Sequence, residues 1–109
     1  MTGQRAEVFA LRVQPGREEE YLARHSAIWP ELEQLFFANG IRRYEIHLHR
    51  ETGLLFAFRL VDIDADLGAI MDHPVMQRWR VHMADVLVQD DGRPVRELLE
   101  RMYVFNPPG

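Results

Sequence analysis

The chain has 109 residues, a length that suits a single domain and leaves no room for a separate cofactor domain, and its hydrophobic fraction of 47% is enough to build a core. Its net charge is −4 and its basic residues are scattered, so we expect no nucleic-acid partner, because phosphate binding needs a basic footprint. The absence of cysteine excludes disulfides, thiolate nucleophiles and sulfur-ligated zinc, and the absence of a signal peptide or of a run of ~20 apolar residues predicts a cytoplasmic protein without a membrane span.

The first two predicted elements are a strand and a helix. Apolar residues alternate from Glu7 to Val13, which predicts a largely buried strand. A helix is predicted from Arg17 to Ala38, because acidic residues occupy its first turn and Asn39-Gly40 follows its end. Pro30 lacks a backbone donor and disfavours helical geometry at Trp29, so we expect a kink or a break into two helices there.

Two strands follow and are expected to form a hairpin. From Ile41 to His49, apolar and polar residues alternate with the period of a half-exposed strand. A second apolar run extends from Leu54 to Val61, and the polar connection 50–53 between the two contains a glycine. These features predict antiparallel pairing of the two runs.

The last third of the chain is predicted to hold a second helical region and a final strand. The helical pattern begins near residues 64–71, is interrupted at His73-Pro74 and resumes from Val75 to Leu87. The segment 90–94 is predicted to be the loop that ends it, and Leu98 to Phe105 to be the last strand, followed by an unstructured tail.

The predicted order of elements is strand, helix, strand, strand, helix, strand. This βαββαβ order defines an α+β fold of the ferredoxin-like type, with helices on one face of an antiparallel sheet, in one domain that spans residues 1–109. The chain supplies no third layer for the other face of the sheet. We therefore expect a second copy to cover that face, which gives a symmetric homodimer.

The segment from Tyr21 to Leu32 carries the candidate chemistry. Tyr21 and His25 are four residues apart, so on a helix both side chains project from the same face and can share one pocket wall. The alternative interpretation is structural, because a histidine in such a helix is more often a surface or packing residue. On that interpretation Trp29 anchors the core and Tyr21 is a partly buried packing residue.

Taken together, several segments resemble the L-rhamnose mutarotase family from about Phe9 to Phe105. The most specific is His25-x-x-Ile28-Trp29-Pro30-Glu31-Leu32, since Trp-Pro within a helical stretch is rare. The other segments agree with the family in order and spacing: Tyr44-x-Ile46-x-Leu48, Leu54-Leu55-Phe56-Ala57, Gln77-Arg78-Trp79 and Met83-x-Asp85-Val86. The resemblance implies a dimeric α/β barrel type of fold and an isomerase that interconverts the anomers of L-rhamnose.

The resemblance also implies roles for individual residues. His25 matches the proton donor, and the positions that bind the sugar correspond to Tyr21, Tyr44, Trp79 and Arg80. At Arg80 the sequence departs from the family pattern, in which a second aromatic residue often follows the tryptophan. A guanidinium can donate hydrogen bonds to sugar hydroxyls but cannot replace an aromatic stacking face.

The implied reaction is suited to these residue types. Ring opening gives a proton to the ring oxygen and removes one from the anomeric hydroxyl, and a group with an ordinary pKa near ~6.5, such as His25, can do either at neutral pH. The reaction needs no metal, nucleotide or covalent intermediate. We therefore expect no cofactor and no metal, in agreement with the lack of a glycine-rich phosphate loop and of a carboxylate-rich metal cluster.

The sequence is also compatible with three other interpretations. His47 and His49 face the same side of a strand, but a metal site needs three or four convergent ligands, so a solvated face or dimer surface is favoured. The fold also suits a small cofactor-independent oxygenase, because paired sheets of this kind enclose apolar pockets. A ligand-sensing or dimerisation module is the non-enzymatic alternative, in which Tyr21, His25 and Trp79 would only line a pocket.

Overall fold

The computed structural model describes residues 3–108. Its elements follow in the order one strand, two helices, two strands, two helices and three short strands: β1 (Gln4–Arg12), α1 (Glu18–Ser26), α2 (Pro30–Ala38), β2 (Ile41–His49), β3 (Leu54–Asp62), α3 (Leu67–Asp72), α4 (Pro74–Met83), β4 (Gln89–Asp90), β5 (Arg93–Pro94) and β6 (Glu97–Leu98). Among these residues no helix combines the length and apolar character that a membrane crossing needs.

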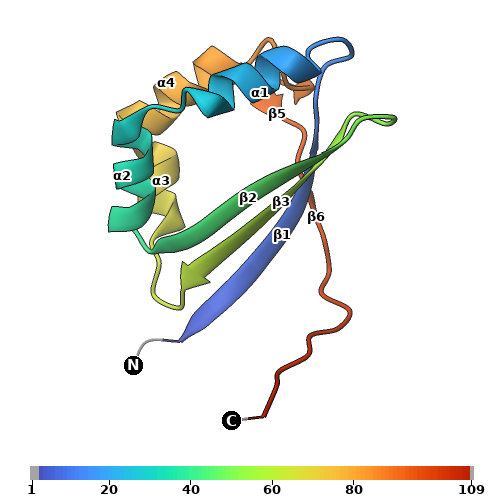
Figure 1. The fold of residues 1–109 in the computed structure, drawn as a ribbon. Helices are drawn as coiled ribbons and strands as arrows, with labels where there is room; N and C mark the ends of the chain where they lie inside the picture. The colour runs from blue at the N-terminus through green and yellow to red at the C-terminus, as the bar shows by residue number, and fades with distance from the viewer. Residues whose placement is uncertain (1–2, 109) are drawn as a thin grey trace.

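The main sheet has the strand order β2-β3-β1-β6, and each pair of neighbours is antiparallel. The four helices found among residues 3–108 cover the same face of this sheet, and no second layer of these residues covers the other face (Figure 1). The prediction of an α+β, ferredoxin-like fold is therefore confirmed. The hairpin of β2 and β3 forms as expected, with Ile46 opposite Ala57 and His49 opposite Leu54.

The predicted break in the first helical stretch is also confirmed. Trp29 has extended backbone angles (φ −68°, ψ 127°), and Pro30 is the first residue of α2, where a missing N–H costs no hydrogen bond. At the other end of α2, Gly40 adopts a φ of +100°, and a Cβ there would lie 2.7 Å from the Cβ of Ala65. Only glycine satisfies both this backbone conformation and this close approach.

The second helical region begins later than predicted and is divided as predicted. The helix α3 starts at Leu67 because the side chain of Asp66 caps it, accepting a hydrogen bond from the backbone N–H of Ala69 at 3.0 Å. His73 has extended backbone angles between the two helices, and its Nδ1 accepts a hydrogen bond from the N–H of Val75 at 3.1 Å. The interruption predicted at His73-Pro74 is thus found between the two helices.

The segment predicted as a loop at 90–94 is a short hairpin instead. Strands β4 and β5 pair through Gln89–Pro94 and Asp90–Arg93. Between them Asp91 and Gly92 have φ values of 52° and 77°. Two successive positive φ angles form the turn that matches the twist of a hairpin, and Asp-Gly is a strong sequence signal for it.

The predicted last strand, Leu98 to Phe105, is wrong for most of its length. Only Glu97 and Leu98 pair with β1, opposite Ala10 and Phe9, and residues 99–108 have no regular secondary structure. The apolar residues of this segment favour a strand, but a strand also needs a neighbour for its backbone groups. After Leu99, whose N–H donates to Val8, the chain turns away from β1 (Figure 1).

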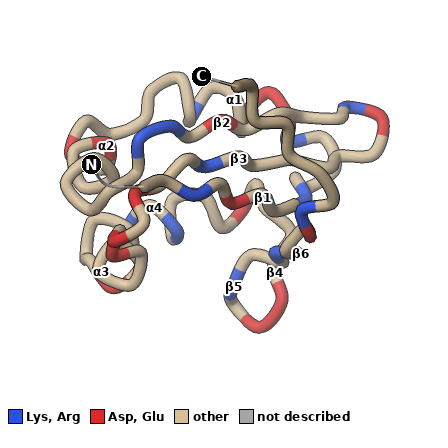
Figure 2. Tube along the Cα trace, turned by 90° about the horizontal axis from the view of Figure 1, so that it is seen from below, with Lys and Arg blue, Asp and Glu red and all other residues tan. Residues whose placement is uncertain are grey.

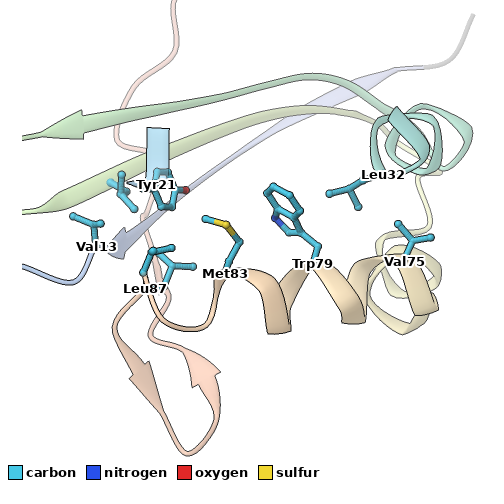
Figure 3. Close-up of a cluster of buried hydrophobic side chains, with 9 residues drawn as sticks. Val13, Tyr21, Leu32, Val75, Trp79, Met83 and Leu87 are labelled. Atoms are coloured by element: carbon cyan, nitrogen blue, oxygen red, sulfur yellow. The ribbon is translucent and has the colours of Figure 1, made fainter. Parts of the chain in front are cut away.

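The main core lies between the sheet and helix α4 (Figure 3). Its buried members come from both layers: Val13, Tyr21, Leu32, Leu55, Val75, Trp79, Met83, Val86 and Leu87. The strand β3 alternates as the period of a strand requires, so Leu55, Ala57 and Val61 are buried beneath the helices. Two of the predicted site residues, Tyr21 and Trp79, are therefore part of the core.

Candidate active site

A cavity of about 630 Å³ lies between the sheet and helices α1, α2 and α4. Its lining includes residues of both layers, among them Tyr21 and His25 from α1, Tyr44 and Ile46 from β2, and Trp79 from α4. Cavities of this size and largely apolar lining are typical of sites for small molecules. We call this space the large lobe.

A second cavity of about 240 Å³ adjoins the first and is called here the small lobe. The two lobes have six lining residues in common: Tyr21, His25, Tyr44, Ile46, Met76 and Trp79. Four of the five residues predicted to form the site are in this shared wall. The fifth, Arg80, lines the small lobe but not the large one.

The spacing of Tyr21 and His25 on α1 places their rings against each other. The ring centroids are 4.3 Å apart and the planes are tilted by 27°, which is a stacked arrangement. The edge of the imidazole also contacts Trp79, at 5.4 Å between centroids and an interplanar angle of 89°. His25 is therefore held between an aromatic ring of its own helix and one of α4.

A backbone contact fixes the tautomer of His25. Its Nδ1 lies 3.1 Å from the carbonyl oxygen of Tyr21, and a carbonyl can only accept, so Nδ1–H donates and Nε2 carries the lone pair. Burial lowers the pKa of His25 from its ordinary value, and this hydrogen bond opposes the shift in part. At neutral pH the imidazole is uncharged, with Nε2 ready to accept a proton.

The two tyrosines of the shared wall keep their protons. Burial is the main cause that raises the pKa of Tyr21, and Tyr44 adds to it because two neighbouring phenolates would repel each other. Burial likewise raises the pKa of Tyr44, although the positive charges of Arg59 and Arg96 oppose this. Both hydroxyls are therefore hydrogen-bond donors at neutral pH.

Trp79 forms an apolar wall of both lobes and is itself only 6% exposed. Trp29 packs edge-on against it, with 5.1 Å between centroids and an interplanar angle of 84°. His82, an exposed residue of α4, lies 5.4 Å from the ring of Trp29. The aromatic residue before Pro30 thus supports the wall of the cavity from behind.

Arg80 points along α4 toward α3. Its Nη2 lies 3.3 Å from the sulfur of Met71 and 3.5 Å from the carbonyl oxygen of the same residue. Because these contacts are weak, the guanidinium keeps most of its donor capacity for the small lobe.

Sequence reasoning missed one functional candidate, the ion pair of Arg59 and Glu7. These residues are cross-strand partners, and Arg59 Nη2 lies 2.6 Å from a carboxylate oxygen of Glu7. The signal was present in the sequence, because Arg59 interrupts the apolar run of β3 at a position that must face the core.

Of the two histidines on β2, His47 lines the large lobe and His49 lines neither lobe. His47 is exposed, and its Nε2 lies 3.0 Å from a carboxylate oxygen of Glu45. His49 is exposed and contacts the hydroxyl of Thr52 at 2.7 Å. Within residues 3–108 no three groups of the kind that ligate metals come together.

Comparison with known proteins identifies the family of the chain. Residues 7–106 match the family described as L-rhamnose mutarotase. The chain belongs to the L-rhamnose mutarotase family. A member from Sinorhizobium fredii is 44% identical over 96 residues, which cover 87% of this chain and 92% of that protein. Another, from Brucella anthropi, is 42% identical over 104 residues, covering 94% and 97% of the two chains.

Solved structures support both the family and the fold. The crystal structure of an L-rhamnose mutarotase from Formosa agariphila is 33% identical, has a TM-score of 0.82, and is covered over 99% of its length by 94% of this chain. A protein from Bordetella bronchiseptica described among antibiotic biosynthesis monooxygenases has a TM-score of 0.66 at 18% identity, covering 93% and 99%. At that identity the likeness concerns the fold alone, the dimeric α/β barrel type, and gives no support to an oxygenase activity.

Proposed function

We propose that the protein interconverts the α and β anomers of L-rhamnose by acid-base opening and closure of the pyranose ring. The observation that carries this proposal is the arrangement of His25, whose Nδ1 is held by the carbonyl of Tyr21 while Nε2 remains for the cavity. Family membership supports the same reaction. The proposed setting is rhamnose metabolism in the cytoplasm.

In ring opening, we assign the role of base to neutral His25. Nε2 takes the proton of the anomeric hydroxyl, the electrons of that O–H bond form the aldehyde, and the bond from C1 to the ring oxygen breaks. The ring oxygen takes a proton from a donor, a role that suits the protonated hydroxyls of Tyr21 and Tyr44 or a water they hold. The open chain then turns about its C1–C2 bond.

Ring closure reverses both proton transfers on the other face of the aldehyde. The imidazolium returns its proton to the carbonyl oxygen, so His25 is the proton donor of this half of the reaction. The donor group recovers its proton from the attacking hydroxyl. Trp79 and Tyr44 are proposed to bind the sugar, because an indole face suits the C–H surface of a pyranose and a phenol adds a hydroxyl at its polar rim.

The direct test follows freshly dissolved α-L-rhamnose by optical rotation, with saturation-transfer NMR to measure anomer exchange at equilibrium. We expect exchange to accelerate in proportion to the concentration of protein. An exchange rate that equals that of the buffer, with protein shown to be folded by circular dichroism, would reject the proposal.

The pH dependence of kcat/KM tests the protonation state assigned to His25. The pKa of the folded imidazole lies below its ordinary value of about 6.5, so the base form persists at neutral and mildly acidic pH. We expect kcat/KM to be constant near neutrality and to fall only when the pH drops through that lowered pKa. The measurement is kcat/KM as a function of pH, with rates corrected for buffer catalysis. If kcat/KM already began to fall above pH ~7 as the pH was lowered, the assignment would be contradicted.

Tyr44→Phe is expected to raise KM for L-rhamnose by roughly tenfold while changing kcat less, since a hydrogen bond from a protonated phenol to the substrate is lost. The phenylalanine keeps the packing against Phe36, whose ring lies 5.7 Å from that of Tyr44. Tyr103→Phe is the matched control, because Tyr103 is 79% exposed and lies outside both lobes. An unchanged KM in the Tyr44 variant would exclude the contact.

We also propose that two copies of the chain pair through the faces of the sheet that the helices leave uncovered (Figure 1). Val8 and Phe56 are 36% and 39% exposed on this face. The neighbouring tail adds further exposed apolar side chains: Leu98, Leu99, Met102, Tyr103, Val104 and Phe105. Contiguous apolar surface of this kind marks an interface, and an isologous pairing would cover it on both copies at once.

Phe56→Glu should separate the proposed dimer, because it buries a carboxylate without a partner at the centre of the interface. Size-exclusion chromatography with light scattering is expected to give a dimer mass for the unchanged protein and a monomer mass for this variant. Val81→Glu is the control, because Val81 is 78% exposed on α4, on the opposite side of the sheet. A monomer mass for the unchanged protein at micromolar concentration would contradict the pairing.

A further inference from the structure

The small lobe is unusually rich in arginine. Four of the residues that line it are Arg59 from β3, Arg80 from α4, Arg93 from β5 and Arg96 from the segment before β6. Basic residues on β3 and on the hairpin at β5 can be followed in Figure 2. No Asp or Glu belongs to the described residues that line this lobe, although the whole chain has a net charge of −4. The lobe is therefore a local concentration of positive charge.

Arg59 lines the lobe and is buried, with 7% of its surface exposed. Its guanidinium lies over the rings of Phe9 and Tyr44, at 4.9 and 5.5 Å from their centroids. One nitrogen pairs with Glu7, but Nε is buried and has no hydrogen-bond partner among the described residues. A buried donor without a partner is costly, so the charge of Arg59 is only partly compensated by Glu7.

Two carboxylates neighbour the four arginines, Glu7 opposite Arg59 and Asp90 opposite Arg93, and neither lines the lobe. Glu7 is shared between Arg59 and Arg5. Arg96 also lies over the Phe9 ring, at 4.1 Å from its centroid. Burial and then the like charge of Arg59 lower the pKa of Arg96, so the two guanidinium groups disfavour each other in the absence of an anion.

The other two arginines, Arg80 and Arg93, form no ion pair among the described residues, although Arg80 contacts Met71 and Arg93 lies opposite Asp90 in the β4–β5 hairpin. The ion pairs formed among residues 3–108 do not include Arg80, Arg93 or Arg96. Guanidinium groups present several donors in a planar fork that matches carboxylate and phosphate oxygens. A partly enclosed space with charge of one sign also focuses the field on an incoming ion.

We propose that the small lobe binds an anionic group, a carboxylate or a phosphate carried by a sugar, and that acidic monosaccharides bind more tightly than neutral ones. The shared wall of Tyr21, His25, Tyr44 and Trp79 puts this lobe next to the place assigned to the pyranose. The turnover of such sugars rests on the mutarotase function proposed above. The binding of an anion is independent of that function.

Inorganic phosphate is the probe that tests the anion site without turnover. Isothermal titration calorimetry at low ionic strength is expected to detect binding, and Arg96→Gln and Arg93→Gln are each expected to weaken it by about tenfold, the loss of one charge-assisted contact. Arg101→Gln is the matched control, because this arginine borders the uncovered face of the sheet and not the small lobe. Binding should also weaken as salt is added.

Turnover is tested with D-galactose, D-galacturonate, D-galactose 6-phosphate and L-rhamnose by saturation-transfer NMR. We expect KM to be about tenfold lower for the acidic sugars than for D-galactose, and this difference to disappear in Arg96→Gln. Preference for the carboxylate or for the phosphate identifies which anion the lobe takes.

The outcomes separate the two proposals. Phosphate binding that depends on Arg96 without acceleration of any sugar would reject the mutarotase function and retain the anion site. Acceleration of L-rhamnose, with no phosphate binding and no preference for acidic sugars, would overturn the anion site and retain the function. Binding that Arg96→Gln and Arg93→Gln leave unchanged would also overturn the anion site.

Discussion

His25→Ala is expected to lower kcat/KM for anomer exchange by about 10²- to 10⁴-fold, the usual contribution of a positioned acid-base group. The reason is the loss of Nε2, the position to which we assign both proton transfers at the anomeric oxygen. The fold should survive, because His25 is only partly buried and its side chain bonds to the backbone of its own helix. Saturation-transfer NMR gives the rate, and circular dichroism checks the fold.

His49→Ala serves as the control for this experiment. His49 is an exposed residue of β2 that contacts Thr52 and lines neither lobe, so its loss should leave kcat/KM unchanged. If His25→Ala keeps near-wild-type activity, His25 does not carry the proton. Partial rescue of the alanine variant by free imidazole would add support for the assigned role.

Trp79→Ala is expected to lower the free energy of unfolding by about 3–5 kcal/mol, the range measured when a large aromatic residue is removed from a core. The indole is 6% exposed and forms edge contacts with Trp29 and His25, so its removal leaves a cavity that the helices cannot fill. Urea unfolding followed by circular dichroism measures the loss. Activity should fall as well, since Trp79 lines both lobes.

Trp79→Phe separates the two roles of this residue. A phenyl ring keeps an apolar wall and part of the packing, so we expect a smaller loss of stability than with alanine and a measurable activity. If the alanine variant lost less than about 1 kcal/mol, Trp79 would not be the packing centre inferred here, because surface substitutions cause changes of that size.

The helices and the central strands could be predicted because local signals determine them. Pro30 specified the break between α1 and α2, and the alternation from Ile41 to His49 gave β2 with the bounds found in the structure. The last strand could not be predicted in this way. The apolar pattern from Leu98 to Phe105 indicates which side chains favour burial. Strand pairing depends in addition on where the edge of β1 lies in space, and the pattern does not contain that information.

The candidate site shows the same division. Helical spacing alone brought Tyr21 and His25 to one face, and the family resemblance added Tyr44, Trp79 and Arg80, all of which line the connected lobes. The arginines of the small lobe come from separate elements and have no regular spacing in the sequence. Their convergence depends on cross-strand register and on the β4–β5 hairpin, so it becomes visible only in three dimensions.

The size of the two adjoining lobes also bears on how closely the cavity can enclose a sugar. Between ring opening and ring closure, the aldehyde must rotate by about half a turn about the C1–C2 bond. A pocket that fits C1 tightly would prevent this rotation. The two lobes, of about 630 and 240 Å³, share one aromatic wall and offer more space than a pocket shaped around a single anomer would. Such a pocket accepts both anomers as substrates and hastens their exchange without altering their equilibrium ratio.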